Sequence, residues 1–143
     1  MRHHGFLHVN LNVVDLACSV RFYTQALGFT VVSESSETAD LGSGDETIHQ
    51  VVLTAPGTRT LLALTQAPSL PVGPRGLNHL GLVLESDTDL DALIPRVTAN
   101  GGSIQKQGTR QQSGESEAFA YVRDPDGYAL ELSTQAILYG RFP

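Results

Sequence analysis

Several features that would assign a protein to a special class are scarce in this sequence. It holds one cysteine, Cys18, which excludes an intrachain disulfide framework and agrees with a reducing compartment. No apolar run approaches the length of a membrane span, and the first residues lack the apolar stretch of a signal peptide. We therefore expect a cytoplasmic protein with no membrane segment.

An excess of positive charge is also missing. The formal net charge is −6, and no cluster of Lys or Arg is long enough to follow a phosphate backbone. Nucleic acid is therefore not an expected partner. With 41% hydrophobic and 17% charged residues, the chain has the composition of a globular domain, and its 143 residues are enough to bury a core.

The first half of the chain has the pattern of one strand, one helix and three further strands. Residues 6–13 alternate strictly between apolar and polar, which is typical of a half-buried strand, and His8 is on the polar face. Asp15 is an N-cap candidate for a helix that ends at Ala26, before Gly28. The three strands are expected at residues 29–33, 47–53 and 60–65.

The same pattern returns after an irregular linker at about residues 67–76. Asp124-Pro125-Asp126-Gly127 has the composition of a tight turn and precedes the last strand. Pro95 lies inside the second predicted helix, where it indicates either a kink or a later helix start. The expected elements are a strand at 77–84, a helix at 88–100, extended chain at 103–106, a polar loop at 107–117, and strands at 118–122 and 128–134.

This repeat predicts the fold class. We expect one α+β domain made of two tandem βαβββ modules, at about residues 5–66 and 77–135, followed by a short C-terminal tail. Neither module needs to close a core alone. Two curved half-sheets facing each other would form a half-open mixed β-barrel with a cleft and flanking helices.

Three residues with metal-binding side chains occupy comparable places in the repeat. His8 and His79 lie in the first strands of the two halves, and Glu131 lies in the last strand between Leu130 and Leu132. Each is on the face turned away from the predicted helix, and a buried strand glutamate is costly without a partner. Each alone could be an ordinary hydrogen-bonded or solvated strand residue. Together, two imidazoles and a carboxylate are a ligand set for Fe²⁺, Mn²⁺, Zn²⁺ or Ni²⁺.

Short motifs distributed over nearly the whole chain lead to a family. They are Leu7-His8-Val9, Val14-Asp15-Leu16, Ser19-Val20-Arg21-Phe22-Tyr23, Leu27-Gly28-Phe29, Asn78-His79-Leu80-Gly81, Asn100-Gly101-Gly102, and Asp124-Pro125-Asp126-Gly127-Tyr128 with Leu130-Glu131-Leu132. In these motifs the chain resembles the vicinal-oxygen-chelate superfamily, which includes glyoxalase I, extradiol dioxygenases, fosfomycin-resistance proteins and bleomycin-binding proteins. The resemblance implies one divalent metal ion on His8, His79 and Glu131, a small-molecule substrate bound through vicinal oxygens, and a homodimer.

One position departs from the pattern of metal-dependent glyoxalase I. That enzyme has a glutamate on the fourth strand of its first half, which is both a ligand and a catalytic group. The equivalent residue here is expected to be Ala63, which can neither bind a metal nor move a proton. The three-ligand set that remains resembles those of extradiol dioxygenases and of the fosfomycin-resistance metal transferases.

Two further residues are candidates for catalysis. Tyr121 stands three residues before the Asp-Pro turn, as in the extradiol dioxygenases, and is otherwise an ordinary strand aromatic. The upstream histidine of that signature is replaced by Gln111, Gln112 and Ser113. His49 would be a general base if its strand face turned into the cleft, and is otherwise a structural histidine.

The sequence therefore predicts a divalent-metal-dependent enzyme that acts on a small oxygenated molecule, either dioxygenase-like or a Lewis-acid lyase or isomerase. Two alternatives stay open. In a fosfomycin-type transferase, Lys106 and Arg110 would bind the phosphonate, although both could equally lie in a solvated loop. A drug-binding protein of the bleomycin-resistance type would use the same cleft without a metal.

Overall fold

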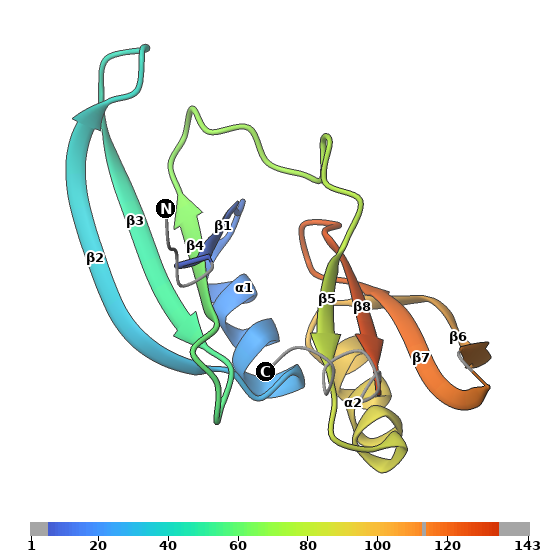
Figure 1. Ribbon diagram of the computed structural model, residues 1–143. Coiled ribbons are helices and arrows are strands. Elements are labelled where there is room, and N and C mark those ends of the chain that lie inside the picture. The colour runs from blue at the N-terminus through green and yellow to red at the C-terminus, as the bar shows by residue number, and fades with distance from the viewer. Residues whose placement is uncertain (1–5, 113, 135–143) are drawn as a thin grey trace, which may run out of the picture. The chain divides into compact units, whose positions relative to one another are not determined.

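The computed structural model describes residues 6–112 and 114–134, which belong to two compact units, 1–73 and 74–143. The placement of the two units relative to each other is not determined (Figure 1). The predicted end of the second module at residue 135, and Ser113, lie outside the described residues. No helix in this described part is both long and apolar enough to cross a membrane.

The first unit has the predicted order of one strand, one helical segment and three strands. Its sheet order is β1-β4-β3-β2, in which β1 and β4 are parallel and the other neighbours antiparallel. The elements are β1 (Val9–Asn12), α1 (Leu16–Arg21), the π-helical turn η1 (Phe22–Ala26), β2 (Thr30–Asp40), β3 (Asp45–Thr54) and β4 (Leu61–Gln66).

The helical segment of the first unit begins where the sequence predicts. The Asp15 carboxylate accepts a hydrogen bond from the backbone N–H of Cys18 at 2.9 Å, which satisfies a donor that the first helical turn leaves without a partner. The buried ring of Tyr23 contacts the buried rings of Phe22 and Phe29 edge to face. Since α1 packs on β3 and β4, the core of this unit lies between the helical segment and one face of the sheet.

The second unit repeats the first. Its sheet order is β5-β8-β7-β6, again with the first and last strands parallel, so the two tandem βαβββ modules are confirmed as two four-stranded mixed sheets. The elements are β5 (Leu80–Val83), α2 (Asp87–Ala99), β6 (Ser103–Gln112), β7 (Glu115–Arg123) and β8 (Ala129–Ser133).

Helix α2 starts at Asp87 and contains Pro95 in its interior, so the proline does not mark a later start. Ser86 caps the helix through a hydrogen bond from the backbone N–H of Asp89 at 3.3 Å. The helix packs on β6 and β7. Its buried residues Leu90 and Val97 lie on the side of the sheet where alternate strand residues are also buried, namely Ala120, Val122, Leu130 and Leu132.

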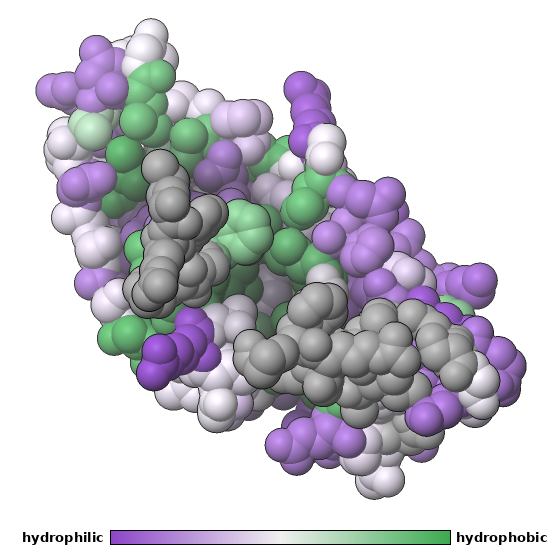
Figure 2. Space-filling view, viewed as in Figure 1, coloured by the Kyte–Doolittle hydropathy of each residue, from purple (hydrophilic) through white to green (hydrophobic). Residues whose placement is uncertain are grey.

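Strands β2 and β6, at the edges of their sheets, are longer than predicted. The polar loop expected at 107–117 is wrong: β6 continues to Gln112 and pairs with β7 along its length. In the same way, β2 runs to Asp40 instead of ending at residue 33. Each of these outer strands pairs with one neighbouring strand and is solvated along its length. Its side chains need not alternate between apolar and polar residues, so the sequence carries no period-two pattern that would predict the strand. Hydrophilic residues with a few apolar ones between them cover the region of β2 (Figure 2).

The turn before β8 is fixed by a buried aspartate. One carboxylate oxygen of Asp124, whose residue is 3% exposed, accepts hydrogen bonds from the backbone N–H groups of Asp126 and Tyr128 at 3.0 and 2.9 Å. Gly127 has a φ of 87°, a conformation that other residues rarely adopt. This turn therefore sets where β8 begins and which face its residues occupy.

Replacing Gly127 with alanine should lower the free energy of unfolding by about 1–2 kcal/mol, because a Cβ is unfavourable at positive φ. Urea denaturation followed by circular dichroism would measure the change. Gly108→Ala is the matched control, since Gly108 does not have a positive φ and its added Cβ would make an ordinary contact with Phe119. Equal losses in the two variants would contradict this account of the turn.

Candidate metal site

The two predicted histidine ligands occupy the same place in their units. His8 and His79 each lie one residue before the first strand, β1 or β5, rather than within it. The His8 residue is exposed. Since the two histidines belong to different units, their joint site is a proposal, taken up below.

The strand pairing of the two sheets can be compared position by position. In the second unit Gly81 lies beside Glu131 in the parallel pair β5–β8. In the first unit Asn10 lies beside Ala63 in the parallel pair β1–β4. Ala63 therefore occupies in the first sheet the position of Glu131 in the second. Its 2% exposed side chain supplies no ligand.

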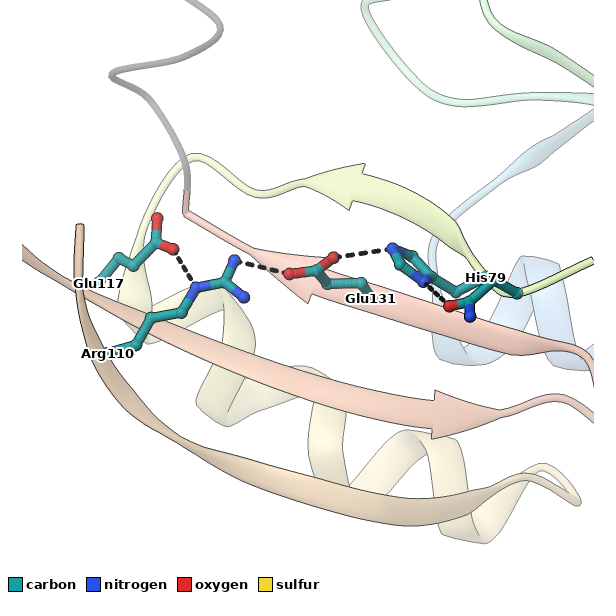
Figure 3. A network of polar contacts seen from close by, with 5 residues as sticks. His79, Arg110, Glu117 and Glu131 are labelled. Carbon is teal, nitrogen blue, oxygen red and sulfur yellow. Dashed lines mark hydrogen bonds and ion pairs between the residues drawn. The ribbon is translucent and has the colours of Figure 1, made fainter. Parts of the chain in front are cut away.

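His79 and Glu131 form a close pair on the face of the second sheet that is turned away from α2 (Figure 3). The Nε2 atom of His79 is 3.0 Å from Oε2 of Glu131. The other ring nitrogen, Nδ1, is 2.6 Å from the side-chain oxygen of Asn78. Side-chain exposure is 34% for His79 and 12% for Glu131, so the carboxylate is largely removed from solvent.

The geometry of this pair fits two neighbouring ligands of one metal ion. Both ring nitrogens of His79 face acceptor oxygens, but a neutral imidazole has one N–H to donate. When Nδ1 donates to Asn78, Nε2 needs a second proton or a metal ion. Metal-bound histidines commonly donate their other N–H to an oxygen in this way. Two ligand atoms about 2.1 Å from one ion and at right angles to each other are about 3.0 Å apart.

Sequence reasoning did not predict the cation on the other side of Glu131. Arg110 on β6 donates from its Nη2 to Oε1 of Glu131 at 2.6 Å, and its Nε donates to Oε1 of Glu117. The two carboxylate side chains are 12% and 9% exposed. Arg110 was expected in a solvated loop because its strand was not recognised, whereas its regular alternation with Gly108 and Lys106 places it on the sheet face that carries Glu131.

The guanidinium of Arg110 keeps its charge under all ordinary conditions. The hydrogen bond that Arg110 donates to Glu117 raises the pKa of Arg110, with further contributions from Glu131 and Tyr121, and these outweigh the effect of burial. Its Cζ atom also lies over the Phe119 ring, 5.0 Å from the ring centroid. Arg110 therefore neutralises one oxygen of Glu131 permanently and leaves Oε2 directed at His79.

Tyr121 contacts the same cluster. It lies beside Glu131 in the antiparallel pair β7–β8, and its ring meets that of His79 edge to face, with 5.5 Å between the ring centroids. A second edge-to-face contact, at 6.0 Å, joins Tyr121 to Phe119. The predicted catalytic tyrosine is therefore next to a predicted ligand, where its ring also restricts the orientation of the imidazole.

His49 was predicted to be a general base if its strand face turned into the cleft, and within the first sheet this condition is not met. Along β3 it alternates in phase with Val51 and Leu53, which are buried on the side where α1 packs. The opposite face carries Gln50, which hydrogen-bonds Thr65 at 3.0 Å. His49 is exposed, and its Nδ1 is 3.1 Å from the hydroxyl of Ser36 on β2.

Within residues 6–112 and 114–134, no three His, Cys, Asp or Glu side chains are grouped closely enough to hold a metal ion. His79 and Glu131 provide two ligands, and the third predicted ligand lies in the other unit. Glu117 is separated from this pair by the guanidinium of Arg110 (Figure 3).

Comparison with known proteins establishes the family. Residues 5–132 match the Glyoxalase/Bleomycin resistance protein/Dioxygenase superfamily, so the chain belongs to it. A lactoylglutathione lyase of Salmonella typhimurium is 32% identical over 132 residues, which are 88% of this chain and 89% of that protein. The chain spans less than half the length of two other relatives. It covers 43% of a lactoylglutathione lyase of Arabidopsis thaliana at 32% identity, and 39% of a catechol-2,3-dioxygenase of Bacillus subtilis at 30%, with 89% and 87% of this chain aligned.

Solved structures of the same fold extend over nearly the whole chain. A glyoxylase/bleomycin resistance protein/dioxygenase domain from Frankia sp. EAN1pec is 28% identical, with a TM-score of 0.66, over 92% of this chain and 98% of that chain. The fosfomycin resistance protein FosX from Mesorhizobium loti is 19% identical, with a TM-score of 0.68, over 99% of this chain and 100% of that chain. The latter likeness shows the fold alone.

Removing the cation between the two carboxylates should destabilise the second unit. We expect Arg110→Met to lower the free energy of unfolding by on the order of 2 kcal/mol, because Glu117 and Glu131 lose a charged donor while they remain largely buried. Chemical denaturation of the full chain would measure this. Adding Glu117→Gln should recover part of the loss, since one uncompensated charge is removed.

Lys106→Met is the control for this comparison. Its amino group lies over the Phe119 ring at 5.7 Å from the centroid, on an exposed residue, so its loss should change stability little. Equal stability of the Arg110→Met variant and the unsubstituted protein would mean that the two ion pairs contribute nothing.

Proposed function

We propose that this protein is a divalent-metal-dependent enzyme that acts on a small molecule with two neighbouring oxygens, with the metal on His8, His79 and Glu131. The observation that carries the proposal is the 3.0 Å approach of His79 Nε2 to Glu131 Oε2, made while Nδ1 already faces Asn78. This is the arrangement of an imidazole and a carboxylate prepared for one ion.

His8 is the third ligand in this proposal because of the repeat. It precedes β1 as His79 precedes β5, and its strand pairs in parallel with β4 as β5 does with β8. Ala63, at the position that corresponds to Glu131, adds no fourth protein ligand. Three protein ligands leave coordination positions for two oxygens of a substrate.

The chemistry follows from this ligand set. When bound, the metal would act as a Lewis acid that stabilises negative charge on the substrate oxygens. Arg110 holds Oε1 of Glu131, so the carboxylate presents one oxygen toward His79. Tyr121, in contact with the His79 ring, is the candidate to hold or move a proton at its phenolic oxygen.

The relatives' names favour two reaction types. Similarity to lactoylglutathione lyases supports Lewis-acid isomerase or lyase chemistry, and similarity to a catechol-2,3-dioxygenase supports oxygen chemistry at the same kind of site. A phosphonate-binding role is less well supported, because the guanidinium of Arg110 is already paired with two carboxylates. The identity of the bound metal would distinguish between these reaction types.

Elemental analysis of anaerobically purified protein should find about one divalent metal ion per chain. His8→Ala, His79→Ala and Glu131→Ala should each reduce this content at least tenfold, since each removes a ligand. Iron would favour dioxygenase chemistry, and manganese, zinc or nickel would favour lyase or isomerase chemistry. Far-ultraviolet circular dichroism would verify that each variant is folded.

His49→Ala is the matched control, because it removes an exposed imidazole on the face of the first sheet where α1 packs. Its metal content should equal that of the unsubstituted protein. Stoichiometric metal in both the His79→Ala and the Glu131→Ala variants would refute the site. A protein that takes up no metal at all would instead be a ligand-binding member of the family.

We further infer a homodimer, as the family resemblance implies, and we propose for it the arrangement in which His8 of one chain completes the site of its partner. Neither the His8→Ala nor the Glu131→Ala variant alone would hold metal. Unfolding and refolding the two variants together should restore about one quarter of the sites, because half of the dimers are mixed and one of their two sites is intact. Sites built within one chain would give no recovery in the mixture.

A further inference from the structure

The side chain of Ser133 on β8 ends in a buried hydroxyl. The residue is 4% exposed, and among the residues that the structure describes its Oγ has no hydrogen-bond partner. Ser133 follows Glu131 by two positions on the same strand, so both side chains are on the face turned away from α2. A buried hydroxyl without a hydrogen bond destabilises the folded protein, which makes such a group unusual.

Ser133 also lines a pocket. A pocket of about 120 Å³ is lined by Gly81, Leu82, Val83, Glu131 and Ser133, all of which belong to the second unit. A Cβ added at Gly81 would meet no atom within 4 Å, and Gly81 does not have a positive φ. The backbone conformation therefore does not require glycine at this position, and the missing side chain leaves room next to Glu131.

The first unit contains the same hydroxyl position with both partners present. Thr65 occupies in β4 the place of Ser133 in β8, because Asn12 pairs with Thr65 as Val83 pairs with Ser133. The Thr65 hydroxyl donates to Oδ1 of Asn10 at 2.8 Å and accepts from Nε2 of Gln50 at 3.0 Å. This hydroxyl is fully used within its own unit.

The second unit replaces both partners with residues that cannot hydrogen-bond through a side chain. Gly81 stands at the position of Asn10, and Phe119 stands at the position of Gln50, since Phe119 pairs with Ser133 as Gln50 pairs with Thr65. Among the described residues, neither side-chain partner of the Thr65 hydroxyl therefore has a counterpart at Ser133, which lines the pocket on the sheet face that also carries the glutamate.

We propose that Ser133 is a substrate-positioning residue, whose hydroxyl hydrogen-bonds a neutral alcohol or carbonyl group of a substrate held at Glu131. This inference rests on the proposed function. The pocket walls at Gly81, Leu82 and Val83 are uncharged, which suits a short carbon chain bearing one oxygen. The volume equals that of about four water molecules, so the group has about three or four non-hydrogen atoms. Residues 131 and 133 are about 7 Å apart along the strand, which sets the reach from the metal-bound oxygens.

Two hydroxamates provide a probe of this subsite. Propanohydroxamate offers a metal two vicinal oxygens, and 3-hydroxypropanohydroxamate adds one terminal hydroxyl on the same chain. In the metal-loaded protein the hydroxylated probe should bind about tenfold tighter by titration calorimetry, from one additional hydrogen bond. Ser133→Ala should abolish this difference while metal content stays unchanged. Gly81→Val should weaken both probes, because it fills the pocket.

A thermal unfolding comparison tests the hydroxyl without any metal or probe. Ser133→Ala should leave the melting temperature unchanged or raise it, because it removes a buried group without a partner. Thr65→Val, the matched control, should lower it by roughly 3–5 °C, because Asn10 and Gln50 lose their partner. An equal loss in both variants would overturn the proposal.

The outcomes separate the two proposals. Metal-loaded protein that binds both hydroxamates equally, or that keeps the tenfold preference after Ser133→Ala, would overturn the Ser133 subsite and leave the metal site standing. Protein that takes up no metal would overturn the proposed function, and the subsite with it.

Discussion

The parallel pairing of the first and last strand in each unit is the constraint on which the rest of the structure depends. Parallel strands cannot be joined by a tight turn, so a helix and two further strands must lie between them in the chain. In the second unit this pairing brings His79, just before β5, to Glu131 on β8. Glu131 is thereby held within the sheet, His79 directly precedes the first residue of β5, and the buried Asp124 turn fixes the start of β8. The sheet consequently positions Glu131, and His79 is fixed by its direct connection to β5.

The two sheets use one backbone arrangement for different purposes. The first satisfies its polar groups internally, through the hydrogen-bonded chain of Gln50, Thr65 and Asn10. At the matching positions the second has a carboxylate in place of Ala63, and its described residues include no hydrogen-bond partner for the Ser133 hydroxyl. A buried carboxylate is tolerated there because Arg110 and His79 each face one of its oxygens. The first sheet thus satisfies its buried hydroxyl internally, whereas the described residues of the second provide no partner for the equivalent hydroxyl.

The order of elements, the N-cap at Asp15 and the turn at Asp124 were predictable because each is a local property of the chain. The face of Glu131 was predictable as well, since strand alternation has a period of two residues. The full lengths of β2 and β6 were not, because these solvated edge strands carry polar residues on both faces. That omission concealed Arg110, whose contact with Glu131 joins residues 21 positions apart in the sequence.

The sequence by itself therefore determined the repeated module, the faces of its inner strands, and the residue types available for a metal. Only the tertiary structure decided which of these side chains meet. Strand periodicity assigns a side chain to a face, but its partners on that face are set by register between strands that are distant in the chain. His79 and Glu131 were predicted as members of one site from the repeat and the family resemblance, whereas the guanidinium that holds Glu131 and the position of the Ser133 hydroxyl became visible only once the register was known.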